Sequence, residues 1–174
     1  MYNVNDMKNT LKEAAKILLT AAVLAFLLIK FVLIPCVVDG ASMYPILENN
    51  DFGYSFVLSR NLGISRFNIA VISIDNGSNR KLLVKRVIGL PGEKVEYRDD
   101  RLYINGEYVE EPFLSELIVT EDLEIQLGEG EYFCLGDNRS ISRDSRYYGP
   151  FQKKDILSTH LFILFPFSHF GYKD

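Results

Sequence analysis

Histidine, cysteine and dense basic sequence are all scarce in this chain. Its 174 residues include two histidines and two cysteines. Cys36 and Cys134 are far apart and fit neither a Cys-x-x-Cys pair nor the spacing of zinc ligands. We therefore expect two small buried side chains rather than a disulfide, and neither a metal site nor a cofactor. The formal net charge is −4 and lysine and arginine are dispersed, which argues against nucleic acid as a partner.

Internal repeats, low-complexity linkers and, after residue 40, amphipathic helical patterns are also missing. Hydrophobic residues make up 48% of the chain and charged residues 24%, which suits one folded domain with an appendage. Short runs rich in β-branched and aromatic residues, separated by turn-forming residues, predict strands at residues 52–58, 69–74, 82–88, 94–97, 102–104, 132–135 and 160–165. The sequence therefore predicts a mostly β domain.

Two connections in this domain have signals of their own. Asn105-Gly106 stands between two short apolar runs and predicts a hairpin, because both residues tolerate positive φ. The segment 110–131 is acidic and weakly patterned. We expect it to be a solvated surface excursion with one strand at residues 123–127.

The N-terminal part begins as a polar stretch and continues as an apolar one. Residues 1–16 contain three lysines, and residues 17–38 are almost entirely apolar apart from Lys30. As a helix, the apolar stretch would measure about 33 Å, enough for a bilayer hydrocarbon core of about 30 Å. The Lys30 ammonium could reach the interface while its stem stays among acyl chains. The sequence therefore predicts one transmembrane helix at residues 17–38.

A cleaved signal peptide is the alternative, since a basic start followed by an apolar run also fits that class. Against it, the apolar stretch is too long, and residues 35–38 offer no small-x-small cleavage site. The lysines precede the span, so the positive-inside rule places residues 1–16 in the cytoplasm. Residues 39–174 would then form an extracytoplasmic domain on a single-pass cell-membrane anchor.

The first polar turn after the apolar stretch presents the hydroxyl of Ser42. A serine hydroxyl is a weak nucleophile that needs a nearby base and donors for the developing oxyanion. His160 and His169 lie in an apolar C-terminal stretch, so a Ser-His-Asp triad stays open but has little support. Lys85 lies in a β-branched apolar run, where desolvation would lower its pKa and allow it to act as the base.

A third stretch, residues 136–150, follows a predicted strand and is dense in Asp, Asn, Ser and Arg. Alone, it would indicate only a network of turns. The Ser42 turn, the run from Lys85 to Glu93 and residues 136–149, in this order after a membrane anchor, resemble the type I signal peptidases over nearly the whole chain. The resemblance implies a signal-peptidase-like β-sheet domain and a serine endopeptidase with a Ser-Lys dyad.

The resemblance also implies a role for each matching residue. Ser42 matches the nucleophile, whose backbone N–H is the expected oxyanion donor, Lys85 matches the general base, and Ser142 matches the residue that orients the lysine amine. Four charged residues of the third stretch match structural positions: an ion pair that holds the loop, Asp144 and Arg146, and two supporting residues, Asp137 and Arg139.

The chain departs from the family pattern at a few positions. Many relatives from bacteria with an outer membrane have a hydroxyl residue two positions before the nucleophile, where this chain has Gly40. This difference and the compact size resemble the Gram-positive branch, and they leave the second oxyanion donor unassigned. Ile46 replaces the usual threonine after the proline, and residues 50–53 alter the usual Gly-Asp segment. These changes concern the geometry of the loop.

Members of this family cut signal peptides from secreted preproteins after small-x-small sequences, at the outer face of the membrane that anchors the enzyme. Ser42 follows the apolar stretch by a few residues, so an extended chain could carry it little more than about 15 Å from the bilayer. The resemblance implies that the substrate binds as an added strand between the segment before Ser42 and the strand ending at Lys85. Shallow apolar pockets would be lined by Cys36, Val38, Leu47 and Val84, and would select small residues.

Two other classes of protein are weighed against this interpretation. A self-cleaving repressor shares the Ser-Lys chemistry, but it would need a DNA-binding module where this chain has an apolar span. A non-catalytic assembly factor that binds secreted or pilin-like subunits would be expected to lose the serine or the lysine.

Residues 165–170 are rich in phenylalanine. Two interpretations stay open for them: contact with the lipid interface, and packing in the core.

Overall fold

The computed structural model of the chain describes residues 4–75, 80–114 and 119–173. The chain divides into two compact units, Met1–Ile34 and Pro35–Asp174. The described part of the first unit is almost entirely one helix. The second contains two β-sheets and a few short helices, so the prediction of a mostly β domain is confirmed.

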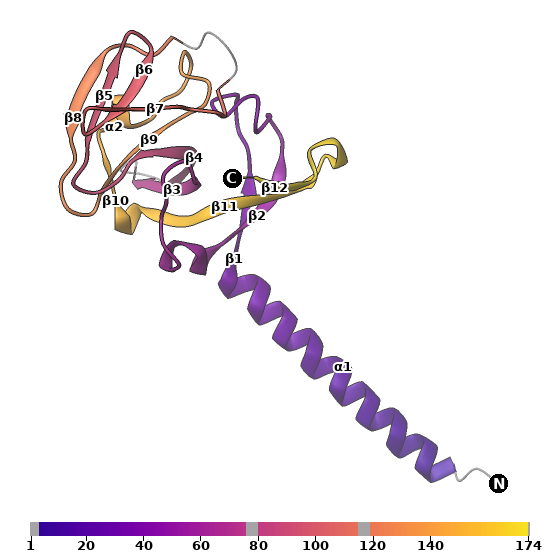
Figure 1. Ribbon diagram of the computed structural model, residues 1–174. Helices are drawn as coiled ribbons and strands as arrows, with labels where there is room; N and C mark the ends of the chain where they lie inside the picture. Colours follow the sequence, from indigo (N-terminus) through magenta and orange to yellow (C-terminus); the bar gives the residue numbers. More distant parts are fainter. Residues whose placement is uncertain (1–3, 76–79, 115–118, 174) are drawn as a thin grey trace. The chain divides into compact units, whose positions relative to one another are not determined.

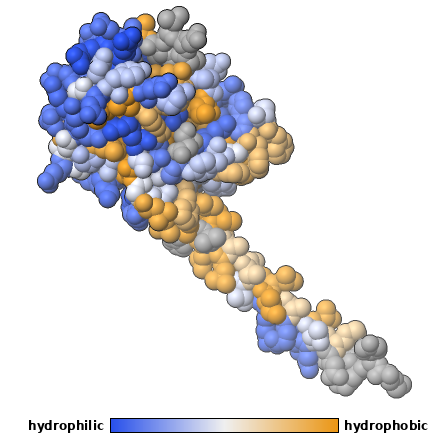
Figure 2. Space-filling view, viewed as in Figure 1, coloured by the Kyte–Doolittle hydropathy of each residue, from blue (hydrophilic) through white to orange (hydrophobic). Residues whose placement is uncertain are grey.

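The N-terminal helix, α1, runs from Val4 to Val32. Polar residues gather toward its N-terminal end and hydrophobic residues cover most of the remainder (Figure 2). Large apolar side chains in this part, among them Ile17, Leu24 and Phe26, are exposed. Over the residues that the structure describes, no helix is both long enough and apolar enough to cross a membrane.

The end of α1 differs from the predicted span of residues 17–38. The helix stops at Val32, and Leu33–Val37 form strand β1. Pro35 has no N–H and cannot continue a helix, and the flanking β-branched residues favour extended backbone. β1 is then held as the neighbour of β2 (Phe52–Phe56) at one end of the larger sheet. Pairing across the sheet therefore decides the last part of the apolar stretch.

The larger sheet has eight strands in the order β1-β2-β11-β3-β4-β9-β10, and β12 pairs with β11 (Figure 1). Its remaining strands are β3 (Ile69–Asp75), β4 (Arg80–Gly89), β9 (Glu131–Leu135), β10 (Phe151–Gln152), β11 (Ile156–Phe165) and β12 (Gly171–Lys173). The smaller sheet has the order β7-β6-β5-β8, formed by β5 (Lys94–Arg98), β6 (Arg101–Ile104), β7 (Glu107–Val109) and β8 (Leu123–Gln126). Four short helices complete the described chain: η1 (Val57–Asn61), α2 (Ser145–Tyr148), η2 (Lys153–Asp155) and η3 (Phe167–His169).

Most of the predicted strands are present, with shifted ends. The predicted run 52–58 is divided between β2 and η1, whereas β1, β10 and β12 had no clear signal in the sequence. The Asn105-Gly106 hairpin is confirmed: φ is 53° at Asn105 and 85° at Gly106, and Tyr103 pairs with Tyr108 across the turn. A two-residue turn of this kind matches the twist of the flanking strands.

Among the described residues, β4 contributes to two hydrophobic clusters of the larger unit. Leu83 and Val87 of β4 belong to the first cluster, which also contains residues of β3, β9 and β11. Ile88 of β4 belongs to the second, which joins β4 and β9 to the smaller sheet. Because side chains alternate along a strand, Lys85 lies on the same face as Leu83 and Val87. Its aliphatic stem therefore lies beside the first core.

The acidic segment 110–131 is not a solvated excursion throughout. Thr120 is 2% exposed, and the side chain of Glu111 is 7% exposed. Both side chains bond the guanidinium of Arg139. Burial of a carboxylate is tolerable when a cation and hydrogen bonds accompany it, and here the partner lies 28 residues away in sequence. The expectation of a solvated segment was wrong for these two residues, whereas the strand predicted within it is present as β8.

Candidate active site

Ser42 lies in a turn between β1 and β2 whose backbone is tied at several points. Val38 N–H donates to Asp51 O at 2.8 Å, and Asn50 N–H returns a bond to Val38 O at 2.9 Å. Gly40 N–H donates to Asn49 Oδ1 at 2.8 Å. Gly40 has φ +91°, in the region where a side chain would strain the backbone. These contacts fix the path of the chain just before the serine.

Lys85 reaches Ser42 from β4. Lys85 Nζ lies 2.7 Å from Ser42 Oγ and donates a second bond to Val84 O at 2.9 Å. The lysine is 3% exposed. Burial lowers the pKa of Lys85 from 10.5 to about 8, although the nearby carboxylates of Asp144 and Asp137 partly oppose the change. With this pKa, roughly one amine in ten is neutral at pH 7.

A neutral amine at this position can accept a proton from the Ser42 hydroxyl. The distance is already that of a good hydrogen bond, and the apolar side chains on each side of Lys85 keep water from stabilising its charged form. The two histidines are engaged elsewhere. His169 Nδ1 lies 2.8 Å from Asp51 Oδ1, and His160 lies beside Asn68. The contact between Lys85 and Ser42 therefore favours the lysine over either histidine as the base.

The turn after β9 packs against the main chain of Ser42 and forms a hydrogen bond with it. Asn138 N–H donates to Ser42 O at 3.1 Å, and Gly136 N–H donates to Asp144 Oδ2 at 3.0 Å. A Cβ atom at Gly136 would overlap with Ser142 Oγ and with the Ser42 carbonyl oxygen. Sequence reasoning did not single out Gly136 or Asn138. A glycine directly after a strand was the available signal, since it often marks close approach of two backbones.

Asp144 and Arg146 form a bidentate ion pair. Arg146 Nε donates to Asp144 Oδ1 and Arg146 Nη2 to Asp144 Oδ2, both at 2.9 Å. Asp144 also caps α2 by accepting the Arg146 N–H. Burial opposes ionisation of Asp144, but the bonds from Arg146 and from Gly136 N–H outweigh it and hold the pKa of this carboxyl below its usual value.

The side chains of Asp137 and Arg139, the two supporting residues, form ion pairs with other residues and not with each other. Asp137 receives two bonds from Arg86, at 2.9 and 2.8 Å, and both side chains of this pair are almost fully buried. Arg86 also donates to Phe67 O at 2.7 Å, and its guanidinium carbon lies 4.1 Å from the ring centroid of Phe113. Because its charge is held on the opposite face of β4 from Lys85, Arg86 does not crowd the amine.

Ser142 does not make the expected contact with the lysine. Its Oγ atom is buried and, within the residues that the structure describes, has no hydrogen bond of good geometry. It lies close enough to Asp144 to help lower the pKa of that carboxyl. The second bond of the Lys85 amine goes to Val84 O instead. Lys85 is therefore oriented by its own strand in this structure.

A groove of about 750 Å³ opens beside the two residues. One wall is formed by residues 37–43 and the other by residues 80–85. Of the four residues expected to form substrate pockets, Val38 and Val84 line this groove. Cys36 and Leu47 do not line it, and both are buried. Within β1 the residue that lines the groove is Val37, which lies on the opposite face from Cys36.

Metal-binding residues were not expected at this site. Within the described ranges, no group of three or more His, Cys, Asp or Glu side chains is placed to hold a metal ion. Cys36 and Cys134 are not joined in a disulfide and both are buried, as small apolar side chains commonly are.

Comparison with known proteins identifies the family. A family model described as signal peptidase, peptidase S26, matches residues 11–165. Signal peptidase I S of Bacillus subtilis (strain 168) is 39% identical over 178 residues, covering 95% of each chain. Signal peptidase IB of Staphylococcus aureus (strain MRSA252) is 31% identical over 185 residues, again covering 95% of each. A crystal structure of a signal peptidase I from Enterococcus faecalis V583 is 37% identical and covers 56% of this chain and 96% of that chain, with a TM-score of 0.48. The resemblance drawn from the motifs is thus confirmed, and the chain belongs to the signal peptidase I family of serine peptidases, peptidase S26.

Proposed function

We propose that this signal peptidase cuts N-terminal signal peptides from secreted preproteins, with Ser42 as nucleophile and Lys85 as general base. The observation that carries the proposal is the 2.7 Å contact between Lys85 Nζ and Ser42 Oγ, made by a lysine that burial brings to a pKa of about 8. Depressed basicity and close approach to a hydroxyl are the two properties that a lysine base requires.

In the first step, Lys85 takes the Ser42 proton as Oγ attacks the scissile carbonyl carbon. The oxyanion that develops can accept a hydrogen bond from the Ser42 N–H. Within the described ranges, this N–H has no other acceptor. Lys85 then returns the proton to the leaving amine, and the peptide before the cut stays as an ester on Ser42. Water, deprotonated by the same amine, hydrolyses the ester and restores both residues.

The groove supports binding of the substrate as an extended strand. β4 pairs with β3 from Arg80 to Arg86, whereas pairing with β9 starts only at Arg86. Among the described strands, none covers the groove side of residues 80–85, so a peptide can add to this edge. Val38 and Val84 then stand beside the residues before the cut. We propose that these side chains leave room for small residues only, which gives small-x-small selectivity.

We further propose that α1 anchors the enzyme in the cell membrane, with residues 1–16 in the cytoplasm and residues 39–174 outside. The run of exposed aliphatic side chains along α1 supports this, since surfaces in water rarely expose so large an apolar area. The lysines before the apolar part support the orientation.

The phenylalanines near the C-terminus support a second contact with lipid. Phe165, Phe167 and Phe170 are 58%, 79% and 56% exposed, so packing in the core does not account for them. Because the chain has no tryptophan, Phe167→Trp introduces a single tryptophan, whose fluorescence can be excited selectively. In proteoliposomes, brominated lipids should quench it, and a tryptophan at exposed Tyr108 should be unaffected. Equal quenching at both positions would contradict lipid contact by the phenylalanines.

Cleavage of a preprotein with an Ala-x-Ala site by the full chain in detergent micelles tests the proposed function. Ser42→Ala and Lys85→Ala should each reduce turnover by at least about 10³-fold, whereas Lys154→Ala, at an exposed lysine, should have no effect. Wild-type turnover in either active-site variant would exclude the dyad. Tight binding of the preprotein without cleavage by the unmodified chain would favour a non-catalytic assembly factor instead.

A further inference from the structure

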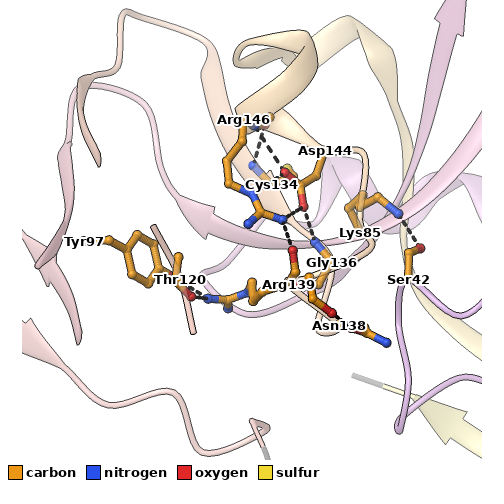
Figure 3. Close-up of polar contacts among 12 residues, drawn as sticks. Ser42, Lys85, Tyr97, Thr120, Cys134, Gly136, Asn138, Arg139, Asp144 and Arg146 are labelled. Carbon is orange, nitrogen blue, oxygen red and sulfur yellow. Dashed lines mark hydrogen bonds and ion pairs between the residues drawn. The ribbon is translucent and has the colours of Figure 1, made fainter. Parts of the chain in front are cut away.

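Arg139 is a fully buried arginine whose guanidinium is bonded on every side. Its side chain is 0% exposed. Nε donates to Gly136 O at 3.0 Å, Nη1 donates to Tyr97 Oη at 3.0 Å and to Thr120 Oγ1 at 3.1 Å, and Nη2 donates to Glu111 Oε1. Figure 3 shows the guanidinium between Tyr97 and Thr120 on one side and the turn after β9 on the other. The side chain therefore bridges two parts of the unit.

Three of these partners come from the smaller sheet and the segment beside it. Tyr97 lies on β5, at the centre of the four-stranded sheet, and is completely buried. Glu111 and Thr120 belong to the chain between β7 and β8. Tyr97 also donates to Glu111 Oε1 at 2.9 Å. These bonds define a polar cradle, Tyr97, Glu111 and Thr120, that holds Arg139 in one orientation.

The other end of the bridge reaches the nucleophile. Arg139 holds the Gly136 carbonyl, and two residues further on Asn138 N–H donates to the Ser42 carbonyl. Arg146 Nη2 donates to Arg139 O at 2.7 Å, which ties the same turn to the ion pair at Asp144. A continuous set of hydrogen bonds thus runs from the smaller sheet, through Arg139 and the turn, to the backbone of Ser42.

We infer that Tyr97, Glu111 and Thr120 are positioning residues of the peptidase, which act through Arg139 on the placement of Ser42. The inference rests on the proposed function, because it takes Ser42 and Lys85 as the reacting pair. Displacement of a reacting group by about 1 Å can reduce a rate by about 10²-fold. A long arginine side chain has many rotamers, and the cradle selects one of them. Loss of one cradle bond should make the turn more mobile. Ser42 Oγ should then point toward Lys85 Nζ for a smaller fraction of the time.

Substitutions that remove one hydroxyl and keep the shape of the side chain give the sharpest test. Tyr97→Phe and Thr120→Val should each lower kcat about 10-fold, with KM changed by less than about 2-fold. Thr120→Ser restores a hydroxyl and should return kcat to near the wild-type value. Tyr103→Phe is the matched control: Tyr103 lies on neighbouring β6 and contacts Tyr108 and Arg98 instead of Arg139.

Kinetics and unfolding are measured on the same full-length preparations in detergent. Each variant is assayed well below its Tm, so that a structural loss alone leaves the folded fraction and kcat unchanged. The inference is supported if kcat falls in Tyr97→Phe and Thr120→Val, recovers in Thr120→Ser and stays constant in Tyr103→Phe. It is overturned if both hydroxyl-deletion variants keep wild-type kcat, whatever their Tm, or if Tyr103→Phe loses as much.

The outcome is separable from that of the proposed function. If the cradle variants are fully active while Ser42→Ala and Lys85→Ala are inactive, the positioning role fails and the dyad stands. If Ser42→Ala or Lys85→Ala is active, the dyad itself fails. Should Tyr97→Phe not fold, the Thr120→Val and Thr120→Ser pair decides the question alone, because valine replaces the hydroxyl of Thr120 by a methyl group, whereas serine keeps the hydroxyl and lacks only the methyl group.

Discussion

Burial of Lys85 should make the stability of the enzyme depend on pH in a defined direction. The folded protein holds the pKa of this lysine at about 8, against 10.5 without the fold. The charged form is therefore disfavoured by folding. Below pH 8 the lysine is charged in both states, and the folded state bears the penalty. As pH rises from 8 to 10.5, the folded state becomes neutral before the unfolded state does, and stability increases.

The size of the effect follows from the difference between the two pKa values. Each pKa unit corresponds to about 1.4 kcal/mol, and most of the change is complete between pH 6 and pH 10. The wild-type protein should thus gain roughly 2–3 kcal/mol of unfolding free energy over this range from Lys85 alone. Lys85→Met removes the titrating group and keeps a flexible side chain of similar length. The difference between the two proteins isolates the contribution of Lys85 from all other groups.

Urea unfolding of both full-length proteins in the same detergent, followed by circular dichroism at pH 6, 7, 8, 9 and 10, measures this difference. At low pH, Lys85→Met should be more stable than the wild-type protein. The difference between their unfolding free energies should decrease by about 2–3 kcal/mol as pH rises. The kcat/KM of the wild-type enzyme should rise about tenfold per pH unit below pH 8 and then level off. A stability difference that is constant with pH would refute the lowered pKa and with it the lysine base.

Three further substitutions test the surroundings of the dyad. Lys81 lowers the pKa of Lys85 by charge repulsion, so Lys81→Glu should move the midpoint of the pH–rate profile to higher pH, while Lys154→Glu, with the same change in net charge, should leave it in place. Asp137→Asn leaves the buried Arg86 guanidinium without its counter-charge and should reduce stability by about 3–5 kcal/mol in urea unfolding; a loss below about 1 kcal/mol would show that the pair is solvated. Gly136→Ala places a methyl group against the Ser42 carbonyl and should lower turnover about 10²-fold, a result that wild-type activity would contradict.

Elements specified by neighbouring residues could be predicted from the sequence. The Asn105-Gly106 hairpin needs positive φ at two adjacent positions, and few residue pairs supply it. β3 is a nearly continuous apolar run, and β4 has apolar and β-branched residues on both sides of Lys85 and Arg86. Strand β1 had no such signal, because its extended conformation depends on β2, which follows after a turn of about fourteen residues. Periodicity within the apolar stretch could not reveal this pairing.

The partners of buried charges were beyond local reasoning. Asp137 and Arg139 are two residues apart, yet they pair with Arg86 and Glu111, which lie 51 and 28 residues away. A carboxylate in an acidic segment is normally solvated, and the bonds that Glu111 accepts from Arg139 and Tyr97 explain why it is buried. The Ser42 and Lys85 pair, 43 residues apart, was accessible because the family resemblance names both. Spacing alone would not have joined them.

The edge of β4 that we propose for the substrate, which no described strand covers at residues 80–85, has a consequence for the enzyme without substrate. Unpaired backbone groups on such an edge can also pair with the edge of another sheet, including that of a second copy of the chain. Arg80 and Lys81 are exposed on this edge, and two such edges meeting would bring cations together. These side chains do not block a single extended peptide, so the proposed site can bind one peptide strand while charge repulsion disfavours pairing with the β4 edge of a second copy.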